Sequence, residues 1–158
     1  MQPEPFTLLM TVYGGDREEH VRDAFRSAVH LQTLRPDQVV LVQDGPVPPA
    51  LTSVLRELVR ISPVEVTFVH LEHNRGLGPA LDAGLHAARH DIVARMDADD
   101  YSMPHRFQTQ VPLVRAGADL VGAGLHGAER EQRRVAPRTP PRGLHHGRRC
   151  ADHAQPPQ

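Results

Sequence analysis

The sequence predicts an α/β fold with a mostly parallel sheet and helices on both of its faces. Apolar runs alternate along the chain with segments of roughly ten to fifteen residues that have helical periodicity, which is typical of parallel βαβ units. Several of the apolar runs end in polar or acidic residues, and open α/β sheets bind their ligands beyond the carboxyl ends of their strands. These observations predict both the fold class and the edge of the sheet at which a ligand would bind.

The first half of the chain is expected to contain two strands and two helices. Residues 6–13 are rich in β-formers and end at two glycines, which predicts a buried first strand. Asp16 and Glu19 have the spacing of a capping box, so a helix that covers the sheet is expected to begin there. Residues 39–42 predict the second strand, and Pro48 and Pro49 suit the entrance of the helix that follows.

The second half repeats this alternation. Residues 64–71 predict a third strand, and a glycine-containing loop then leads into a helix in which Gly84 permits close approach to the sheet. The fourth strand is the apolar run that begins at Ile92. A further helix is expected after it, although Pro112 would cost that helix about 3 kcal/mol or kink it. Residues 119–122 predict the start of a fifth strand.

Composition indicates one domain followed by a tail. The chain has 158 residues, which is room for about one domain, and we place that domain at residues 1–126. Residues 127–158 are rich in Arg, Pro and His and lack apolar periodicity, so we expect this segment to be disordered. Because periodicity is lost within a predicted strand, we also expect a truncated or frameshifted gene product, which translation of the other reading frames would test.

Charge and composition exclude several classes of function. The formal net charge is -1, which argues against a nucleic-acid-binding protein that depends on phosphate electrostatics. Cys150 is the only cysteine, so neither an intramolecular disulfide nor a cysteine-rich zinc site can form. No apolar stretch is long enough to span a membrane, and the N-terminus has no signal-like core. A cytoplasmic protein is expected.

Three carboxylates within four residues follow the predicted fourth strand, and they belong to Asp97, Asp99 and Asp100. Like charges this close disfavour one another's ionisation unless a cation lies between them. Because Mg²⁺ combines one or two protein carboxylates with water and substrate phosphate oxygens, the first hypothesis is a diphosphate bridged by Mg²⁺ or Mn²⁺. A solvated acidic loop is the alternative. An EF-hand is excluded because Ser102 and Gln108 stand where Gly and Glu are required, and an aspartyl-phosphate phosphatase is disfavoured because the chain has no lysine.

Two other strand ends carry polar groups that should converge with these acids. Tyr13, after the first strand, could stack its ring beside a base, and Asp44, after the second, could accept a base N–H. The alternatives are that Tyr13 belongs to the core and that Asp44 only starts a turn with Gly45. The glycine-containing loop at residues 74–78 is weak evidence for phosphate binding and also fits an ordinary helix entry.

Taken together, these segments resemble glycosyltransferase family 2, whose GT-A fold uses nucleotide-diphospho-sugars. The resemblance covers about residues 6–124. Five segments carry it in the family's order: Thr11-Val12-Tyr13, Val42-Gln43-Asp44-Gly45, Asn74-Arg75-Gly76 with Ala80 and Gly84, Ala94 to Asp100, and Pro104 to Phe107 with Gln110. The resemblance implies a Rossmann-like GT-A sheet that would be incomplete at its C-terminal end.

The resemblance also implies a donor site, a metal and a reaction. The residues expected at the donor nucleotide are Thr11, Val12, Tyr13, Asp44, Gly45, Asn74, Arg75, Gly76, Asp97 and Ala98. Mg²⁺ or Mn²⁺ is expected on Asp97 and Asp99, where it would stabilise the leaving nucleoside diphosphate. The expected donor is a UDP- or dTDP-sugar and the acceptor a glycan or lipid-linked molecule. Transfer would invert the anomeric carbon, in polysaccharide or cell-envelope synthesis, in the cytoplasm or at the inner face of the membrane.

Two alternatives to an active glycosyltransferase remain. No residue is identified as the general base, because nothing after Gly127 matches the acceptor-binding half that supplies this carboxylate in the family. The chain could therefore be a non-catalytic remnant that at most binds nucleotide-sugar. A nucleotidyltransferase would carry a glycine-rich basic loop after its first strand, and Gly14-Gly15-Asp16 is too short and acidic for that.

Overall fold

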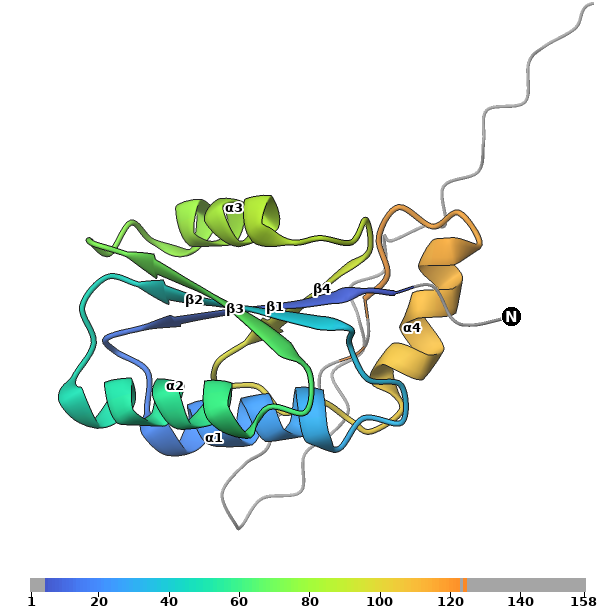
Figure 1. The fold of residues 1–158 in the computed structure, drawn as a ribbon. Helices are drawn as coiled ribbons and strands as arrows, with labels where there is room; N and C mark the ends of the chain where they lie inside the picture. The colour runs from blue at the N-terminus through green and yellow to red at the C-terminus, as the bar shows by residue number, and fades with distance from the viewer. Residues whose placement is uncertain (1–4, 123, 125–158) are drawn as a thin grey trace, which may run out of the picture. The chain divides into compact units, whose positions relative to one another are not determined.

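The computed structural model describes residues 5–122 and residue 124, and its sheet has four parallel strands in the order β3-β2-β1-β4 (Figure 1). The strands are β1 (Thr7–Tyr13), β2 (Gln38–Asp44), β3 (Glu65–Leu71) and β4 (Val93–Asp97). β1 lies between β2 and β4, with Thr7 beside Gln38 on one side and Val93 on the other. The predicted α/β class with a parallel sheet is confirmed.

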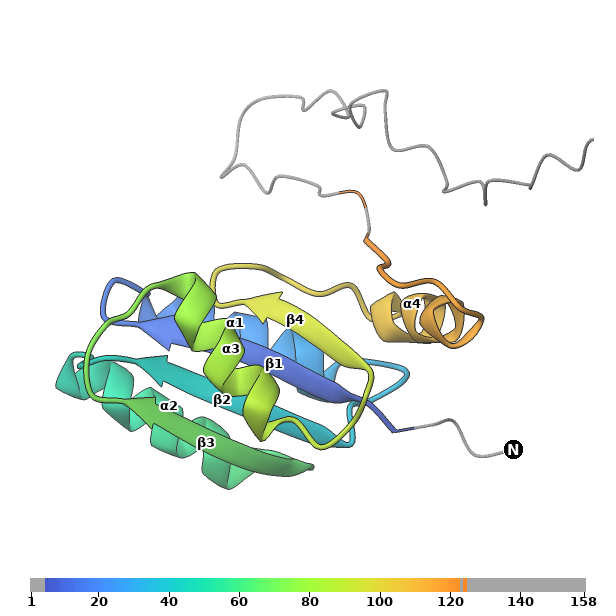
Figure 2. The same cartoon turned by 90° about the horizontal axis from the view of Figure 1, so that it is seen from above.

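Helices cover both faces of this sheet. One face carries α1 (Glu18–Phe25), which continues as a π-helix (Arg26–His30), and α2 (Pro49–Ile61). The opposite face carries α3 (Leu77–Ala87), which lies across the strands when the sheet is seen from above (Figure 2). The last helix, α4 (Arg106–Arg115), follows β4. Each crossover therefore returns the chain to the end of the sheet at which every strand begins, as parallel strands require.

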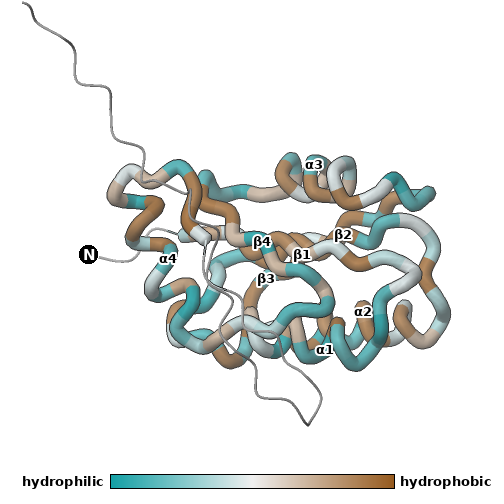
Figure 3. Tube along the Cα trace, turned by 180° about the vertical axis from the view of Figure 1, so that it is seen from behind, coloured by the Kyte–Doolittle hydropathy of each residue, from teal (hydrophilic) through white to brown (hydrophobic). Residues whose placement is uncertain are grey.

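The two faces of β1 pack into different parts of the core, because successive side chains of a strand point to opposite faces. Leu8 and Met10 belong to the larger cluster, which includes residues of α1, α2 and α4. Leu9 belongs to a smaller cluster on the α3 side, together with Val40 and Val42 of β2. Hydrophobic stretches accordingly follow the strands between the helix layers (Figure 3). The central strands are buried on both faces, as their apolar sequences predict.

Helix α3 approaches the sheet most closely at Gly84. A Cβ atom built on this glycine would lie 2.2 Å from Leu9 Cδ1 and 3.0 Å from Val42 Cγ2. The first distance is shorter than real Cβ contacts, and the second is at their lower limit. A larger residue therefore cannot be accommodated without movement of β1 or β2 side chains. The close approach predicted at this glycine is confirmed.

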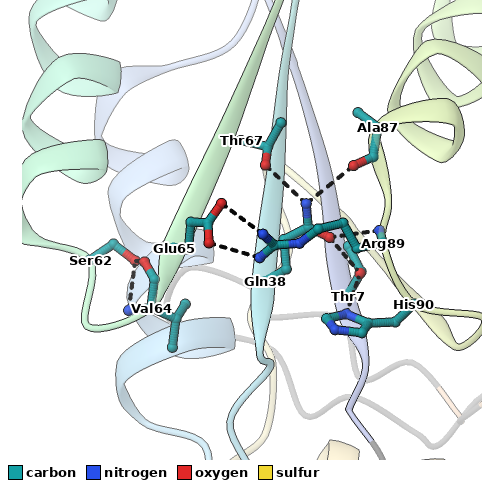
Figure 4. Close-up of polar contacts among 9 residues, drawn as sticks. All are labelled: Thr7, Gln38, Ser62, Val64, Glu65, Thr67, Ala87, Arg89 and His90. Carbon is teal, nitrogen blue, oxygen red and sulfur yellow. Dashed lines mark hydrogen bonds and ion pairs between the residues drawn. The ribbon is translucent and has the colours of Figure 1, made fainter.

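A buried polar network joins the strands near their N-terminal ends (Figure 4). The Gln38 side chain donates from Nε2 to Thr67 Oγ1 at 2.9 Å and to the Ala87 carbonyl at 3.1 Å. Its Oε1 accepts from the Thr7 hydroxyl and from the Arg89 backbone N–H, both at 2.9 Å. All the hydrogen-bonding positions of the amide are thus used, which offsets the cost of burying it. The network lies at the end of the strands opposite to their carboxyl edge.

The structure corrects the prediction of a fifth strand and the prediction of a helix cap. Residues 119–122 form no strand, and Leu120 is 89% exposed. The prediction required this apolar residue to be buried, and it is not. Asp16 does not cap α1, whose N-cap residue is Arg17 and has no side-chain cap bond. The Asp16 carboxylate instead accepts a hydrogen bond from the Tyr13 N–H at 2.9 Å, within the loop that follows β1.

Helix α4 continues through Pro112. Proline lacks the N–H that would bond the carbonyl of Gln108, and both residues are exposed, so water can satisfy that carbonyl. The predicted disordered tail at residues 127–158 and the predicted boundary at residue 126 lie outside the described residues. Within the described part of the chain, no helix has both the length and the apolar character needed to cross a membrane.

Candidate functional site

The polar ends of the strands converge on one cleft at the carboxyl edge of the sheet. Its volume is about 390 Å³. Most of the residues predicted from the sequence line it: Thr11, Val12, Tyr13, Asp44, Asn74, Gly76, Asp97, Ala98 and Asp99. Gly45 and Arg75 belong to neighbouring loop positions and are not among the lining residues. The structure therefore brings together the ends of β1, β2 and β4 and the loop before α3.

The cleft is also lined by four residues that the sequence analysis did not assign to the site: Asp16, Leu77, Ala80 and Arg95. The spacing of Asp16 to Glu19 is that of a capping box, so the sequence predicts a helix cap at Asp16 and not a site residue. Arg95 lies inside the apolar run of β4, yet it is two residues before Asp97, and alternate residues of a strand share a face. This spacing was the available signal that both side chains reach the same cleft.

At the end of β1, the side chain of Tyr13 is 49% exposed, which excludes the alternative that it belongs to the core. Its ring lies over Gly15, because a Cβ atom on that glycine would be only 2.5 Å from Tyr13 Cε2. The loop is closed by two hydrogen bonds, from the Tyr13 N–H to Asp16 Oδ2 at 2.9 Å and from the Asp16 N–H to the Tyr13 carbonyl at 3.1 Å. The aromatic ring is therefore held at the cleft by a loop that requires a residue without a side chain.

We expect Gly15→Ala to displace the Tyr13 ring and to weaken binding of a nucleoside diphosphate. Stacking of a base on an aromatic side chain contributes about 1–3 kcal/mol, so the dissociation constant of UDP should rise by roughly 5- to 150-fold. Isothermal titration calorimetry on Gly15→Ala, Tyr13→Ala and the double variant measures this effect. In the Tyr13→Ala background, Gly15→Ala should have no further effect, whereas additive losses would show that the glycine acts independently of the ring.

At the end of β2, the carboxylate of Asp44 is buried and holds the loop before α3. Its Oδ1 accepts the Arg75 N–H at 2.8 Å and its Oδ2 accepts the Gly76 N–H at 2.9 Å. Gly45 has a φ of +80°, and a Cβ atom there would lie 2.3 Å from the Asn74 nitrogen. The structure thus gives Asp44 a role in fixing the loop. The predicted contact with a base N–H would use the lone pairs that remain on the same carboxylate.

At the end of β4, Asp97 forms a forked ion pair with Arg95. Arg95 Nε and Nη2 donate to Asp97 Oδ1 at 3.0 and 2.7 Å, and Nη2 also donates to Oδ2 at 3.0 Å. The chain then turns, with the Asp100 N–H donating to the Asp97 carbonyl at 3.3 Å. Ala98 is buried within this turn, and Asp99 is exposed on the cleft. The turn therefore presents two carboxylates, those of Asp97 and Asp99, to the same space.

Arg106 attaches α4 to the last part of β4. Its Nη2 donates to the Arg95 carbonyl at 2.7 Å, and its Nε donates to Gln110 Oε1 at 3.1 Å. The guanidinium carbon also lies 5.1 Å from the centre of the Phe107 ring. This half-buried side chain therefore joins α4 to the strand just before Asp97.

Gln32 anchors the segment that follows the acidic turn. Its Nε2 donates to the Ser27 carbonyl at 2.7 Å, to Ser102 Oγ at 3.1 Å and to the Met103 carbonyl at 2.9 Å. The Ser102 N–H in turn donates to Ser27 Oγ at 2.9 Å. Because Arg106 holds the chain before the turn and Gln32 holds it after, the position of the carboxylates is set by contacts on both sides of the turn and not by the turn alone.

The cleft has an excess of negative charge. Burial raises the pKa of Asp16 above its ordinary value, and the carboxylates of Asp99 and Asp97 raise it further, against the hydrogen bond from the Tyr13 N–H. Burial and the same two carboxylates also raise the pKa of Asp100, while Arg106 and Arg95 act in the opposite direction. A cation bound in the cleft would relieve this repulsion.

The donor atoms of the cleft fit Mg²⁺ or Mn²⁺. Among residues 5–122 and 124, no three His, Cys, Asp or Glu side chains are grouped closely enough to hold a metal by themselves. Asp97 and Asp99 would supply oxygen ligands, and water and a diphosphate would occupy the rest of the cleft. Two carboxylates completed by phosphate oxygens and water are the usual ligand set of Mg²⁺ in nucleotide sites. The arrangement therefore suits a metal that arrives with its nucleotide.

Comparison with known proteins agrees with this geometry. The family model described as glycosyl transferase family 2 matches residues 7–155. The chain is 38% identical to the amylovoran biosynthesis glycosyltransferase AmsE of Erwinia amylovora, over 81% of this chain and 50% of that protein. It is 33% identical to the UDP-Gal:alpha-D-GlcNAc-diphosphoundecaprenol beta-1,3-galactosyltransferase of Escherichia coli, over 73% of this chain and 41% of that protein. The chain thus spans half or less of the length of these relatives.

The fold matches that of a solved glycosyltransferase as well. The mannosyltransferase PcManGT from Pyrobaculum calidifontis, solved in complex with GDP-Man and Mn²⁺, superposes with a TM-score of 0.52 at 23% identity, over 60% of this chain and 27% of that one. This likeness concerns the fold, which is the GT-A fold expected from the sequence. The match to the family model and the sequence identity to these two relatives show that the chain belongs to glycosyltransferase family 2.

Proposed function

We propose that this chain binds the nucleotide-diphospho-sugar donor of a glycosyltransferase that acts in polysaccharide or cell-envelope glycan synthesis. The observation that carries the proposal is the pair of strand-end carboxylates, Asp97 and Asp99, which share one cleft with the exposed ring of Tyr13. An aromatic ring suits a base, and carboxylates suit a metal-bound diphosphate, so one cleft offers a partner to each part of a nucleoside diphosphate. The two groups come from β1 and β4, which are adjacent in the sheet.

In the proposed reaction, an acceptor hydroxyl attacks the anomeric carbon of the sugar with inversion. The bond from that carbon to the diphosphate oxygen breaks, and the nucleoside diphosphate leaves with the bonding electrons. The hydroxyl proton would pass to a carboxylate base, a role that we assign to none of the described residues. Asp97 and Asp99 would hold Mg²⁺ or Mn²⁺, which supplies Lewis-acid stabilisation of the leaving group when bound. Tyr13, Thr11 and the loop held by Asp44 would orient the nucleoside.

The relatives support the class of substrate. The Escherichia coli relative is named for a UDP-galactose donor and a diphosphoundecaprenol-linked acceptor, and AmsE is named for the biosynthesis of a polysaccharide, amylovoran. By analogy, we propose a UDP- or dTDP-sugar as donor and a glycan or lipid-linked glycan as acceptor. A lipid-linked acceptor would place the reaction at the inner face of the membrane.

Calorimetric titration tests the donor site directly. UDP-, dTDP- and GDP-sugars are added to the purified protein with and without Mn²⁺, and Asp99→Ala is compared with the wild type. We expect binding that depends on Mn²⁺ and that falls in Asp99→Ala to the level seen without metal. The matched control is Asp82→Ala, which removes an exposed carboxylate of α3 that does not line the cleft. Binding that is independent of Mn²⁺, or equal in Asp99→Ala and wild type, would contradict the proposed site.

A further inference from the structure

Arg95 is the only basic residue among the described residues that line the cleft. The same cleft is lined by four carboxylates, those of Asp16, Asp44, Asp97 and Asp99. Arg75, which the family resemblance placed beside the donor, contributes its backbone N–H to Asp44 and does not line the cleft with its side chain. Among the described residues that line the cleft, Arg95 is therefore the one cation that could bind a diphosphate, and it already pairs with Asp97.

The pairing of Arg95 with Asp97 uses the atoms that a metal would need. All three of its hydrogen bonds go to the two carboxylate oxygens of Asp97, at 2.7–3.0 Å. A carboxylate engaged by a guanidinium fork has less charge and fewer lone pairs to offer to a divalent cation. Arg95 and a metal ion on Asp97 are thus competitors for one group.

The side chain of Arg95 is more exposed and has fewer partners than that of the nearby Arg106. The side chain of Arg95 is 48% exposed, and within residues 5–122 and 124 its guanidinium bonds only to Asp97. Arg106 is bound to the Arg95 carbonyl, to Gln110 and to the Phe107 ring, and it lies partly buried between α4 and β4. The backbone of Arg95 is consequently fixed while its guanidinium remains free to turn within the cleft.

We infer that Arg95 is an exchangeable counter-ion of Asp97 that couples metal binding to nucleotide binding. Without ligand, the guanidinium neutralises Asp97 in place of a metal. When a metal-bound diphosphate enters, Asp97 transfers to the metal and the guanidinium turns to the phosphate oxygens, which it binds as a second cation. The inference rests on the proposed donor site and adds a phosphate-binding residue to it.

This exchange predicts opposite effects of Arg95→Gln on the two ligands. Mn²⁺ alone should bind more tightly to the variant, by about two- to fivefold, because it no longer displaces an exposed ion pair. UDP in the presence of saturating Mn²⁺ should bind more weakly, by about tenfold, because a charge-assisted contact to the diphosphate is lost. The coupling between the two ligands, which is reciprocal, should therefore decrease. A purely structural role of Arg95 would weaken both.

Electron paramagnetic resonance of free Mn²⁺ measures binding of the metal alone, and calorimetry measures UDP in its presence. The control is Arg89→Gln, which removes a similarly forked and exposed ion pair with Glu65 outside the cleft and should change neither value. Arg95→Lys, which keeps the charge without the fork, should recover part of the UDP affinity. Unchanged or weaker Mn²⁺ binding by folded Arg95→Gln would overturn the exchange, whereas a wild type that binds no UDP with Mn²⁺ would instead overturn the donor site.

Discussion

We expect Gly84→Val to lower the free energy of unfolding by about 3 kcal/mol, at the upper end of the 1–3 kcal/mol that overpacking of a close contact typically costs. At this glycine, α3 lies against β1 and β2, and the first added carbon would be 2.2 Å from Leu9 Cδ1. Leu9 and Val42 are both buried, so neither can move aside without disturbing the core. Urea unfolding followed by circular dichroism measures the change.

Gly78→Ala is the matched control for this change, because it lies in the same helix and a Cβ atom there would meet nothing within 4 Å. Alanine is a better helix former than glycine, so this variant should be as stable as the wild type or more stable by up to about 1 kcal/mol. If Gly84→Val and the wild type unfolded at the same urea concentration, the conclusion that α3 packs closely on the sheet at Gly84 would be contradicted.

We expect Asp44→Asn to lower the free energy of unfolding by about 3 kcal/mol and to weaken binding of UDP. The carboxylate accepts two backbone N–H groups, from Arg75 and Gly76, and hydrogen bonds to a charged group contribute about 1.5–3 kcal/mol each. An asparagine has nearly the same shape but places an NH₂ group against one of these N–H donors, which leaves a donor unpaired. Thermal unfolding and calorimetric titration measure the two effects.

Asp37→Asn provides the comparison for this second change. The Asp37 carboxylate accepts a single backbone N–H, that of Phe6 at 3.0 Å, at the opposite edge of the sheet and on an exposed side chain. Its loss should cost about 1 kcal/mol or less and leave UDP binding unchanged. If Asp44→Asn were as stable as Asp37→Asn, the carboxylate would not be what holds the loop before α3.

The strands and their polar ends could be predicted because they depend on local sequence patterns. β1, β2, β3 and β4 are apolar runs with clear ends, and their parallel order places those ends on one edge. The same kind of pattern predicts a fifth strand that the structure does not contain. The apolar residues 120 and 121 form a strand only if another strand accepts their backbone hydrogen bonds. A local pattern contains no information about that partner.

The roles of single side chains in the cleft were harder to predict than its location. The spacing of Asp16 to Glu19 is that of a cap, but the tight turn after β1 brings the carboxylate back to the Tyr13 N–H. The ion pair of Arg95 with Asp97 follows from alternation in a strand, although the sequence alone does not show that the pair faces open space. The anchoring of the acidic turn by Gln32 joins segments that are far apart in the chain.

The order of the strands affects how the chain folds during synthesis. β1 is made first, yet one of its two neighbours in the sheet is β4, so that Thr7 pairs with Val93. Pairing between residues so distant in the sequence is slow, because the chain loses loop entropy before the contact forms. One side of β1 therefore keeps its backbone groups unpaired until β4 has emerged from the ribosome. During that interval the nascent chain exposes an apolar strand edge, which is the kind of surface that chaperones protect from aggregation.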